Sequence, residues 1–201
     1  VSVITGPSGV GKSTTGSAFV QAAARRGEHA TAYLFEETAD QFRYRSDAIG
    51  FGMDELLEHG TLDIREVEPM ELSADEFAHR VREDVEEQDT TVVMLDGTAG
   101  YRLSLRDEEG LLEKLHALCR YLRNVGVTVI LVEEQSQVTG GFSATQENIS
   151  YLADSILFLR YLELEGEIRK AVGVLKKRLG GFEPTLRELR IDGNGLHVGD
   201  P

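Results

Sequence analysis

Residues 6–13 read Gly-Pro-Ser-Gly-Val-Gly-Lys-Ser and fit the pattern G-x-x-x-x-G-K-[ST] of a phosphate-binding loop. The flanking residues fit the same interpretation. Residues 1–5 form a short apolar run typical of a buried strand, and residues 13–26 are typical of a helix that ends at Gly27. We expect Ala18, Phe19, Ala22 and Ala23 on the apolar side of this helix. A strand, a glycine-rich turn and a helix in this order make a chance match improbable.

Glycines allow such a loop to curl so that its N–H groups point at phosphate oxygens, and the start of the helix adds a positive dipole end. Lys12 is expected to reach the β- and γ-phosphates, and the Ser13 hydroxyl to bind Mg²⁺. The residues predicted to bind the nucleotide are Gly6, Pro7, Ser8, Gly9, Val10, Gly11, Lys12, Ser13 and Thr14.

Buried strands and amphipathic helices alternate through the first two thirds of the chain. The expected strands are residues 30–35, 61–67, 91–95 and 127–132, and the expected helices are residues 38–49, 53–59 and 107–125. A further helix is expected to begin at residue 73, with Phe77, Val81 and Val85 on its apolar face. Capping boxes at residues 38–41 and 73–76 mark two helix starts. This alternation predicts an α/β fold, mainly a parallel sheet with helices on both faces.

The last third of the chain has a different pattern. Residues 155–164 and 167–177 are strand-like and flank the two-residue turn Glu165-Gly166, and residues 186–192 and 196–198 flank the turn at residues 193–195. We therefore expect an antiparallel hairpin extension after the parallel core, within one domain that spans residues 1–201.

The charge balance limits the classes of partner. The chain has 35 acidic and 21 basic residues, a net charge of −14, which disfavours nucleic acid as the main partner. No apolar run approaches the roughly 20 residues that span a bilayer, so no membrane is expected. The single cysteine, Cys119, excludes an internal disulfide and is expected in the core. With no basic-then-apolar leader at its start, the chain is expected to be cytoplasmic.

Acidic residues follow two of the expected strands. Asp96 ends the apolar run 92–95, where a carboxylate would face the phosphate site and hold Mg²⁺ or its water. Glu36 and Glu37 end the strand before them, and one of the two is a candidate to take a proton from the attacking water. A solvated pair of loop acids is an equally good interpretation from these residues alone.

The order of several motifs resembles the KaiC family of RecA-like ATPases. After the phosphate loop come Phe-Glu-Glu-Thr at 35–38, Gly-Met-Asp at 52–54, the acidic strand end, and Ile-Ser-Tyr-Leu-Ala-Asp-Ser-Ile-Leu-Phe-Leu-Arg-Tyr at 149–161. Residues 165–171 and 175–178 continue the similarity, which covers nearly the whole chain.

The resemblance implies a RecA-like P-loop NTPase fold, with ATP and Mg²⁺ as ligands. It implies that Glu36 and Glu37 are catalytic and that Lys176 and Arg178 reach the γ-phosphate held by a neighbouring subunit. It also implies slow hydrolysis of ATP at subunit interfaces of a homo-oligomer, a hexameric ring in the family, in a regulatory or signalling role. Residues i and i+2 of a strand share a face, so both cations can converge on one site.

The chain departs from the family pattern in three places. Autophosphorylation in the family uses an adjacent Ser-Thr pair, which here reads Ser150-Tyr151, so only Ser150 is left as a phosphorylation candidate. The family run Lys-x-Arg-Gly-[Ser/Thr]-x-His reads Lys-Lys-Arg-Leu-Gly-Gly-Phe at residues 176–182, so both cations are present and the residues that usually follow them are not. The family domain also has a strand and a turn before the phosphate-loop strand. The chain is therefore interpreted as a fragment of the domain or as one half of a two-domain protein.

Three other functions share some of these sequence features. The phosphate loop alone resembles that of guanylate kinase, but an arginine-rich monophosphate region is missing where residues 35–38 stand. A DNA recombinase or helicase shares the RecA core, and the negative charge argues against it. A nucleotide-dependent assembly switch with little turnover is the alternative outside enzymes.

Overall fold

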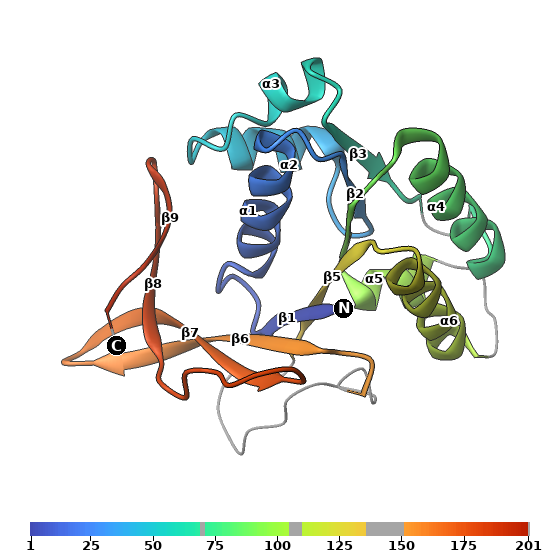
Figure 1. The fold of residues 1–201 in the computed structure, drawn as a ribbon. Coiled ribbons are helices and arrows are strands. Elements are labelled where there is room, and N and C mark those ends of the chain that lie inside the picture. Colours follow the sequence, from blue (N-terminus) through green and yellow to red (C-terminus); the bar gives the residue numbers. More distant parts are fainter. Residues whose placement is uncertain (69–70, 105–109, 136–150, 201) are drawn as a thin grey trace.

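The computed structural model describes residues 1–68, 71–104, 110–135 and 151–200 (Figure 1). The strands are β1 (Ser2–Gly6), β2 (Ala30–Leu34), β3 (Leu62–Glu66), β4 (Val92–Asp96), β5 (Thr128–Glu134), β6 (Ser155–Leu164), β7 (Glu167–Lys177), β8 (Arg187–Asp192) and β9 (Gly195–Val198). The helices are α1 (Lys12–Arg25), α2 (Ala39–Asp47), α3 (Met53–Glu58), α4 (Ala74–Gln88), α5 (Thr98–Ser104) and α6 (Leu111–Asn124).

The described strands form one sheet in the order β3-β2-β4-β5-β1-β6-β7-β8-β9. Pairing is parallel from β3 to β6 and antiparallel from β6 to β9, so β6 joins the parallel core to the extension. Glu165 and Gly166 both have positive φ, 54° and 81°, as a two-residue hairpin turn requires. The predicted fold class, a mainly parallel α/β sheet with an antiparallel extension, is confirmed.

Each face of the parallel part is covered by its own helices (Figure 1). Alternate strand residues such as Ile4 and Met94 pack against α1, α2 and α3, while Val3 and Leu95 pack against α4, α5 and α6. The alternation follows from the period of two along a strand, and covering both faces explains why the strands are nearly continuous apolar runs. Cys119 lies in the second of these cores, as predicted, with its thiol free.

The buried face of α1 agrees in part with the prediction: Ala23 is buried and Ala18 packs, partly buried, against the core, whereas the prediction for Phe19 is wrong. Phe19 is 48% exposed, and the buried residues include Gly16, Val20 and Ala23. A Cβ atom at Gly16 would lie 2.7 Å from the Cε atom of Met94, so α1 lies too close to β4 for a larger residue. Because α1 lies so close to the sheet, the helix face with the smallest side chains packs against the strands. The face that carries the large apolar side chain of Phe19 does not.

Helix α5 was not predicted. It follows β4 directly and contains Gly100, a residue that disfavours helix by about 1 kcal/mol relative to alanine. A Cβ atom at position 100 would lie 2.7 Å from the Cβ atom of Phe35, so tertiary packing requires a glycine there. None of the described helices combines the length and the apolar composition needed to cross a bilayer.

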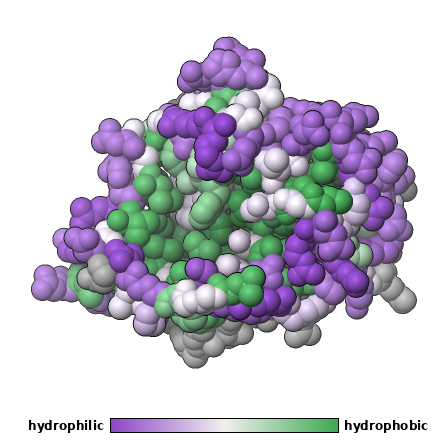
Figure 2. Space-filling model, in the orientation of Figure 1, coloured by the Kyte–Doolittle hydropathy of each residue, from purple (hydrophilic) through white to green (hydrophobic). Residues whose placement is uncertain are grey.

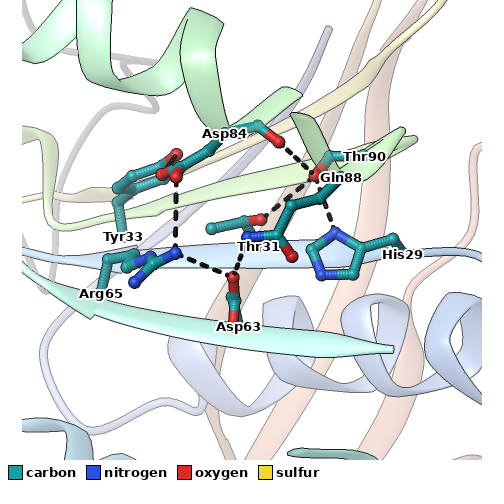
Figure 3. A network of polar contacts seen from close by, with 8 residues as sticks. All are labelled: His29, Thr31, Tyr33, Asp63, Arg65, Asp84, Gln88 and Thr90. Carbon is teal, nitrogen blue, oxygen red and sulfur yellow. Dashed lines mark hydrogen bonds and ion pairs between the residues drawn. The ribbon is translucent and has the colours of Figure 1, made fainter. Parts of the chain in front are cut away.

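A polar network fastens α4 to the sheet near its edge strand β3 (Figure 3). Asp84 of α4 accepts hydrogen bonds from Tyr33 (2.7 Å) and Arg65 (3.4 Å), and Gln88 donates to Asp63 (2.7 Å). At the other end of the network, Nδ1 of His29 lies 2.7 Å from the hydroxyl oxygen of Thr90. Its members are His29, Thr31, Tyr33, Asp63, Arg65, Asp84, Gln88 and Thr90.

The stability of the fold should fall on mild acidification because of His29. Burial lowers the pKa of His29, against Asp63 and Asp84, which raise it, and with Arg65, which lowers it. The folded chain thus binds fewer protons than the unfolded chain as the pH falls below about 6.5, the ordinary histidine pKa, and stability is lost.

Thermal unfolding at about pH 7.5 and about pH 5.5, on either side of that pKa, measures the effect. His29→Asn, which keeps a polar atom near Nδ1, should show a smaller loss of Tm than the parent. His59→Asn, at an exposed position after α3, is the control and should behave as the parent does. An equal loss of Tm in His29→Asn and the parent would exclude His29 as the cause.

Candidate functional site

The parallel register brings the carboxyl ends of four strands to one edge of the sheet. Gly6 of β1 pairs with Glu134 of β5, and Leu34 of β2 pairs with Asp96 of β4. A cleft of about 430 Å³ opens there. It is lined by Ser8, Gly9, Gly11, Lys12, Ser13, Thr14, Glu36, Glu37, Arg45, Asp96, Gly97, Val132, Glu134, Lys170 and Ile191.

The predicted phosphate loop forms one wall of the cleft. Gly11, just before α1, has a φ of 109°, and a Cβ atom there would lie 2.6 Å from the Cδ1 atom of Ile191, so the position requires glycine. Of the predicted loop residues, Gly6, Pro7 and Val10 are buried behind the cleft rather than lining it.

Lys12 is held inside the loop. Its Nζ atom donates to the carbonyl oxygen of Pro7 (2.9 Å) and lies 3.6 Å from Oε2 of Glu134. Burial lowers the pKa of Lys12, and the nearby Glu134, Asp96 and Glu36 carboxylates oppose that shift. The Pro7 carbonyl oxygen and Glu134 therefore hold the ammonium group at the cleft, where it is the positive charge of the loop that can bind an anionic ligand.

Asp96 and Ser13 meet across the cleft. The Ser13 hydroxyl donates to Oδ1 of Asp96 (3.0 Å), and Oδ2 of Asp96 is buried without a hydrogen-bond partner among the described residues. Burial, followed by repulsion from Glu37, raises the pKa of Asp96 to about 7. A hydroxyl beside an unsatisfied carboxylate oxygen fits Mg²⁺, which prefers oxygen ligands and completes its shell with water and phosphate oxygens.

Glu36 is an exposed residue that lines the cleft and lies against the start of α5. Its Oε1 atom accepts a hydrogen bond from the backbone N–H of Gly100 (3.0 Å). Cβ atoms at Gly97 or Gly100 would each lie 2.8 Å from atoms of the Glu36 side chain. The glycines therefore make room for the glutamate, and one backbone N–H binds one of its carboxylate oxygens.

Glu37 is engaged by an arginine from α2. Its Oε1 atom lies 2.6 Å from Nη2 of Arg45 and its Oε2 atom 3.4 Å from Nε. The same guanidinium donates to the Thr14 hydroxyl at 3.3 Å. The two adjacent glutamates thus stand in different surroundings, one on a backbone N–H and the other in an ion pair.

Lys176 and Arg178 lie away from this cleft. Lys176 pairs with Ile156 on β6, and Arg178 follows the end of β7, 3.1 Å from a carboxylate oxygen of Asp154. Arg178 therefore lies outside β7. The alternation of side chains along a strand thus does not establish that Arg178 and Lys176 point to the same side. Ser150 lies outside the described residues.

Four polar or charged residues that contact or line the cleft were missed. Glu134 extends β5 past the predicted end and follows an apolar strand, the same signal that identified Glu36 and Glu37. Lys170 and Tyr161 of the extension reach back to carbonyl oxygens of Gly9 (3.0 Å) and Ser8 (3.2 Å). For these two and for Arg45, no local pattern of the sequence indicates the cleft.

Comparison with known proteins supports the resemblance. A family model described as "ATPase: KaiC" matches residues 1–201. The chain is 24% identical to the circadian clock protein KaiC3 of Synechocystis sp. over 199 residues, which is 99% of this chain and 39% of that protein. It is also 24% identical to the circadian clock oscillator protein KaiC of Picosynechococcus sp. over 196 residues, 98% of this chain and 38% of that one.

The chain therefore spans about two fifths of the length of these relatives. Its mainly parallel α/β sheet, its phosphate loop and the family match across all of its residues agree with one another. On this evidence the chain belongs to the KaiC family of ATPases and has the RecA-like fold of that family.

Proposed function

We propose that this chain binds Mg²⁺–ATP and hydrolyses it slowly at contacts between subunits of a homo-oligomer, in a regulatory or signalling role. The proposal depends most on one observation. A phosphate loop, a Ser13–Asp96 pair with a spare buried oxygen and two differently held glutamates line the same cleft.

We assign each residue of the cleft a role that its surroundings allow. The loop N–H groups and Lys12 bind the β- and γ-phosphates and stabilise the charge that develops on the transferred phosphoryl group. Oε2 of Glu36 takes a proton from water, whose oxygen bonds to the γ-phosphorus as the bond to the ADP oxygen breaks. Glu36 suits this role better than Glu37, because Arg45 engages both oxygens of Glu37.

Ser13 and Asp96 would hold Mg²⁺, which when bound neutralises charge on the phosphate oxygens. To do so Asp96 must be ionised, and the Ser13 hydroxyl must turn from its carboxylate to offer a lone pair. The first change is at the end of β4 and the second is in the first turn of α1.

Lys176 and Arg178 are proposed to act on the nucleotide of a neighbouring subunit. Ser2 pairs with Ser155, next to the Asp154 that binds Arg178, whereas the loop begins after Gly6. At about 3.3 Å per residue, these ends of β1 lie roughly 13 Å apart. A cation at one end is far from the cleft at the other end of its own chain, which supports the proposal that it acts on the nucleotide of the next subunit.

The surface supports such an assembly. A second cavity of about 140 Å³ is lined by Arg120, Arg123 and Arg178, among others. This basic end complements the acidic nucleotide cleft, as a head-to-tail contact requires. Figure 2 also shows apolar residues gathered across the middle of one face, with hydrophilic residues around them, a pattern typical of interfaces. We propose that this assembly is a hexameric ring, as the family resemblance implies.

Other expectations stay predictions. They are serine autokinase activity at Ser150, a cytoplasmic location, weak binding of nucleic acid, and a single domain over residues 1–201.

Lys12→Ala should abolish measurable ATP binding while the chain still folds. The ammonium makes charge-assisted hydrogen bonds to phosphate, each worth about 1.5–3 kcal/mol, so the Kd should rise about 100-fold or more. Equilibrium binding of Mg²⁺–ATP checks this. Lys114→Ala, which removes a lysine paired with Asp75 far from the loop, should bind like the parent. Parental affinity in Lys12→Ala would contradict the loop assignment.

Glu36→Gln should lower kcat by about 10²–10⁴-fold, the usual cost of losing a general base, and should spare ATP binding. The amide keeps the size of the side chain and an oxygen for the Gly100 N–H. Phosphate release under saturating ATP measures kcat, with Glu58→Gln at an exposed position on α3 as the control. The assignment fails if Glu36→Gln, Glu37→Gln and the double variant all turn over at the parent rate.

The Lys176→Ala/Arg178→Ala variant should bind ATP but lose turnover under conditions where the parent assembles. Mixing it with Glu36→Gln/Glu37→Gln should restore part of the activity, because some interfaces then combine intact glutamates with intact cations. The recovery should fade on dilution, since dilution dissolves interfaces. Mixed oligomers that form without any recovery would refute action in trans.

A further inference from the structure

Arg45 is a cation of the cleft that comes from outside the phosphate loop. It lies on α2, lines the cleft, and its side chain is 30% exposed. Its closest contact is the 2.6 Å ion pair with Glu37, the shorter of two contacts that it makes to this carboxylate. A guanidinium paired at two oxygens is a geometry that a lysine cannot reproduce.

Two further contacts fix the position of this guanidinium. It lies 5.1 Å from the centre of the Phe42 ring, one turn earlier on α2, and Phe42 is itself fully buried. It also donates to the hydroxyl of Thr14, in the first turn of α1. Arg45 therefore joins three parts of the site, namely α2, the acidic segment after β2, and the helix that follows the phosphate loop.

Its neighbour on the same helix behaves differently. Arg43 pairs with Asp54 (2.7 Å) and Asp40 (3.4 Å) and does not line the cleft. The two arginines therefore share a helix and a charge but differ in what they touch, and Arg43 provides a matched control for any effect of Arg45.

Without Arg45, the Glu37 carboxylate would be left in a cleft that already holds Glu36, Asp96 and Glu134. Carboxylates that share one cleft repel one another. An unpaired Glu37 would also be free to swing toward the water or the metal position. The pair removes both effects at once.

We propose that Arg45 is a positioning residue that ties Glu37 to the first turn of α1 and leaves Glu36 as the one glutamate free to accept a proton. The proposal rests on the proposed function and adds a residue to it. Arg45 acts through Glu37 and not by direct contact with phosphate, so its loss should lower kcat rather than ATP affinity.

The first test compares Arg45→Gln, Arg45→Lys and Arg43→Gln in hydrolysis and in binding of Mg²⁺–ATP. Arg45→Gln should lower kcat by about 10–100-fold, the scale of one charge-assisted hydrogen bond, with Kd nearly unchanged. Arg45→Lys keeps the charge but cannot contact both carboxylate oxygens as the guanidinium does, so its kcat should lie between those of Arg45→Gln and the parent. Arg43→Gln should have the kcat and the Kd of the parent. A parental kcat in Arg45→Gln, or a loss confined to Kd, would overturn the proposal.

The second test asks whether the effect passes through Glu37. In a Glu37→Gln background, Arg45→Gln should cause little further loss of kcat, because its partner is already gone. The same four chains without nucleotide should show Tm shifts that do not add, which reports the ion pair independently of turnover. Additive losses in kcat, or additive Tm shifts, would overturn the proposal.

These outcomes are distinct from failure of the proposed function. A parent chain that assembles and binds ATP without hydrolysing it would refute the proposed activity and, with it, the role of Arg45. In each outcome named above that would overturn the role of Arg45, the parent chain still hydrolyses ATP.

Discussion

The hydrogen-bond register of the parallel strands is the constraint on which the site depends. Asp96 lies opposite Leu34, and Glu134 lies opposite Gly6, so groups that follow different strands meet at one edge. A shift of one residue in either pairing would turn these side chains to the other face of the sheet. The register is fixed in turn because both faces are buried under helices, and no slipped pairing keeps both apolar cores intact.

Charge is balanced inside the cleft by pairing rather than by exposure. Lys12 faces Glu134, Arg45 holds Glu37, and a backbone N–H holds Glu36. Asp96 keeps a buried side-chain oxygen, Oδ2, for which the described residues supply no hydrogen-bond partner. An unsatisfied buried carboxylate oxygen is costly in a chain without ligand, and the raised pKa of Asp96 reflects that cost. This unpaired oxygen supports the proposal that a cation binds beside Asp96.

The antiparallel extension links the two ends of the molecule. Its strand β7 carries Lys170, which contacts the loop of its own chain, and ends beside Arg178, which lies at the basic end. In the proposed assembly a single strand would thus touch two nucleotide sites.

Most of the fold and the centre of the site follow from local sequence signals. Apolar runs predicted the strands, capping boxes predicted two helix starts, and the glycine-lysine-serine pattern predicted the loop, since each depends on neighbours in the chain. The buried face of α1, helix α5 and the parts played by Arg45 and Lys170 depend instead on contacts between distant segments. The sequence by itself determined which groups carry the chemistry, and tertiary packing decided which of them stand together, because distance in space is not encoded by distance along the chain.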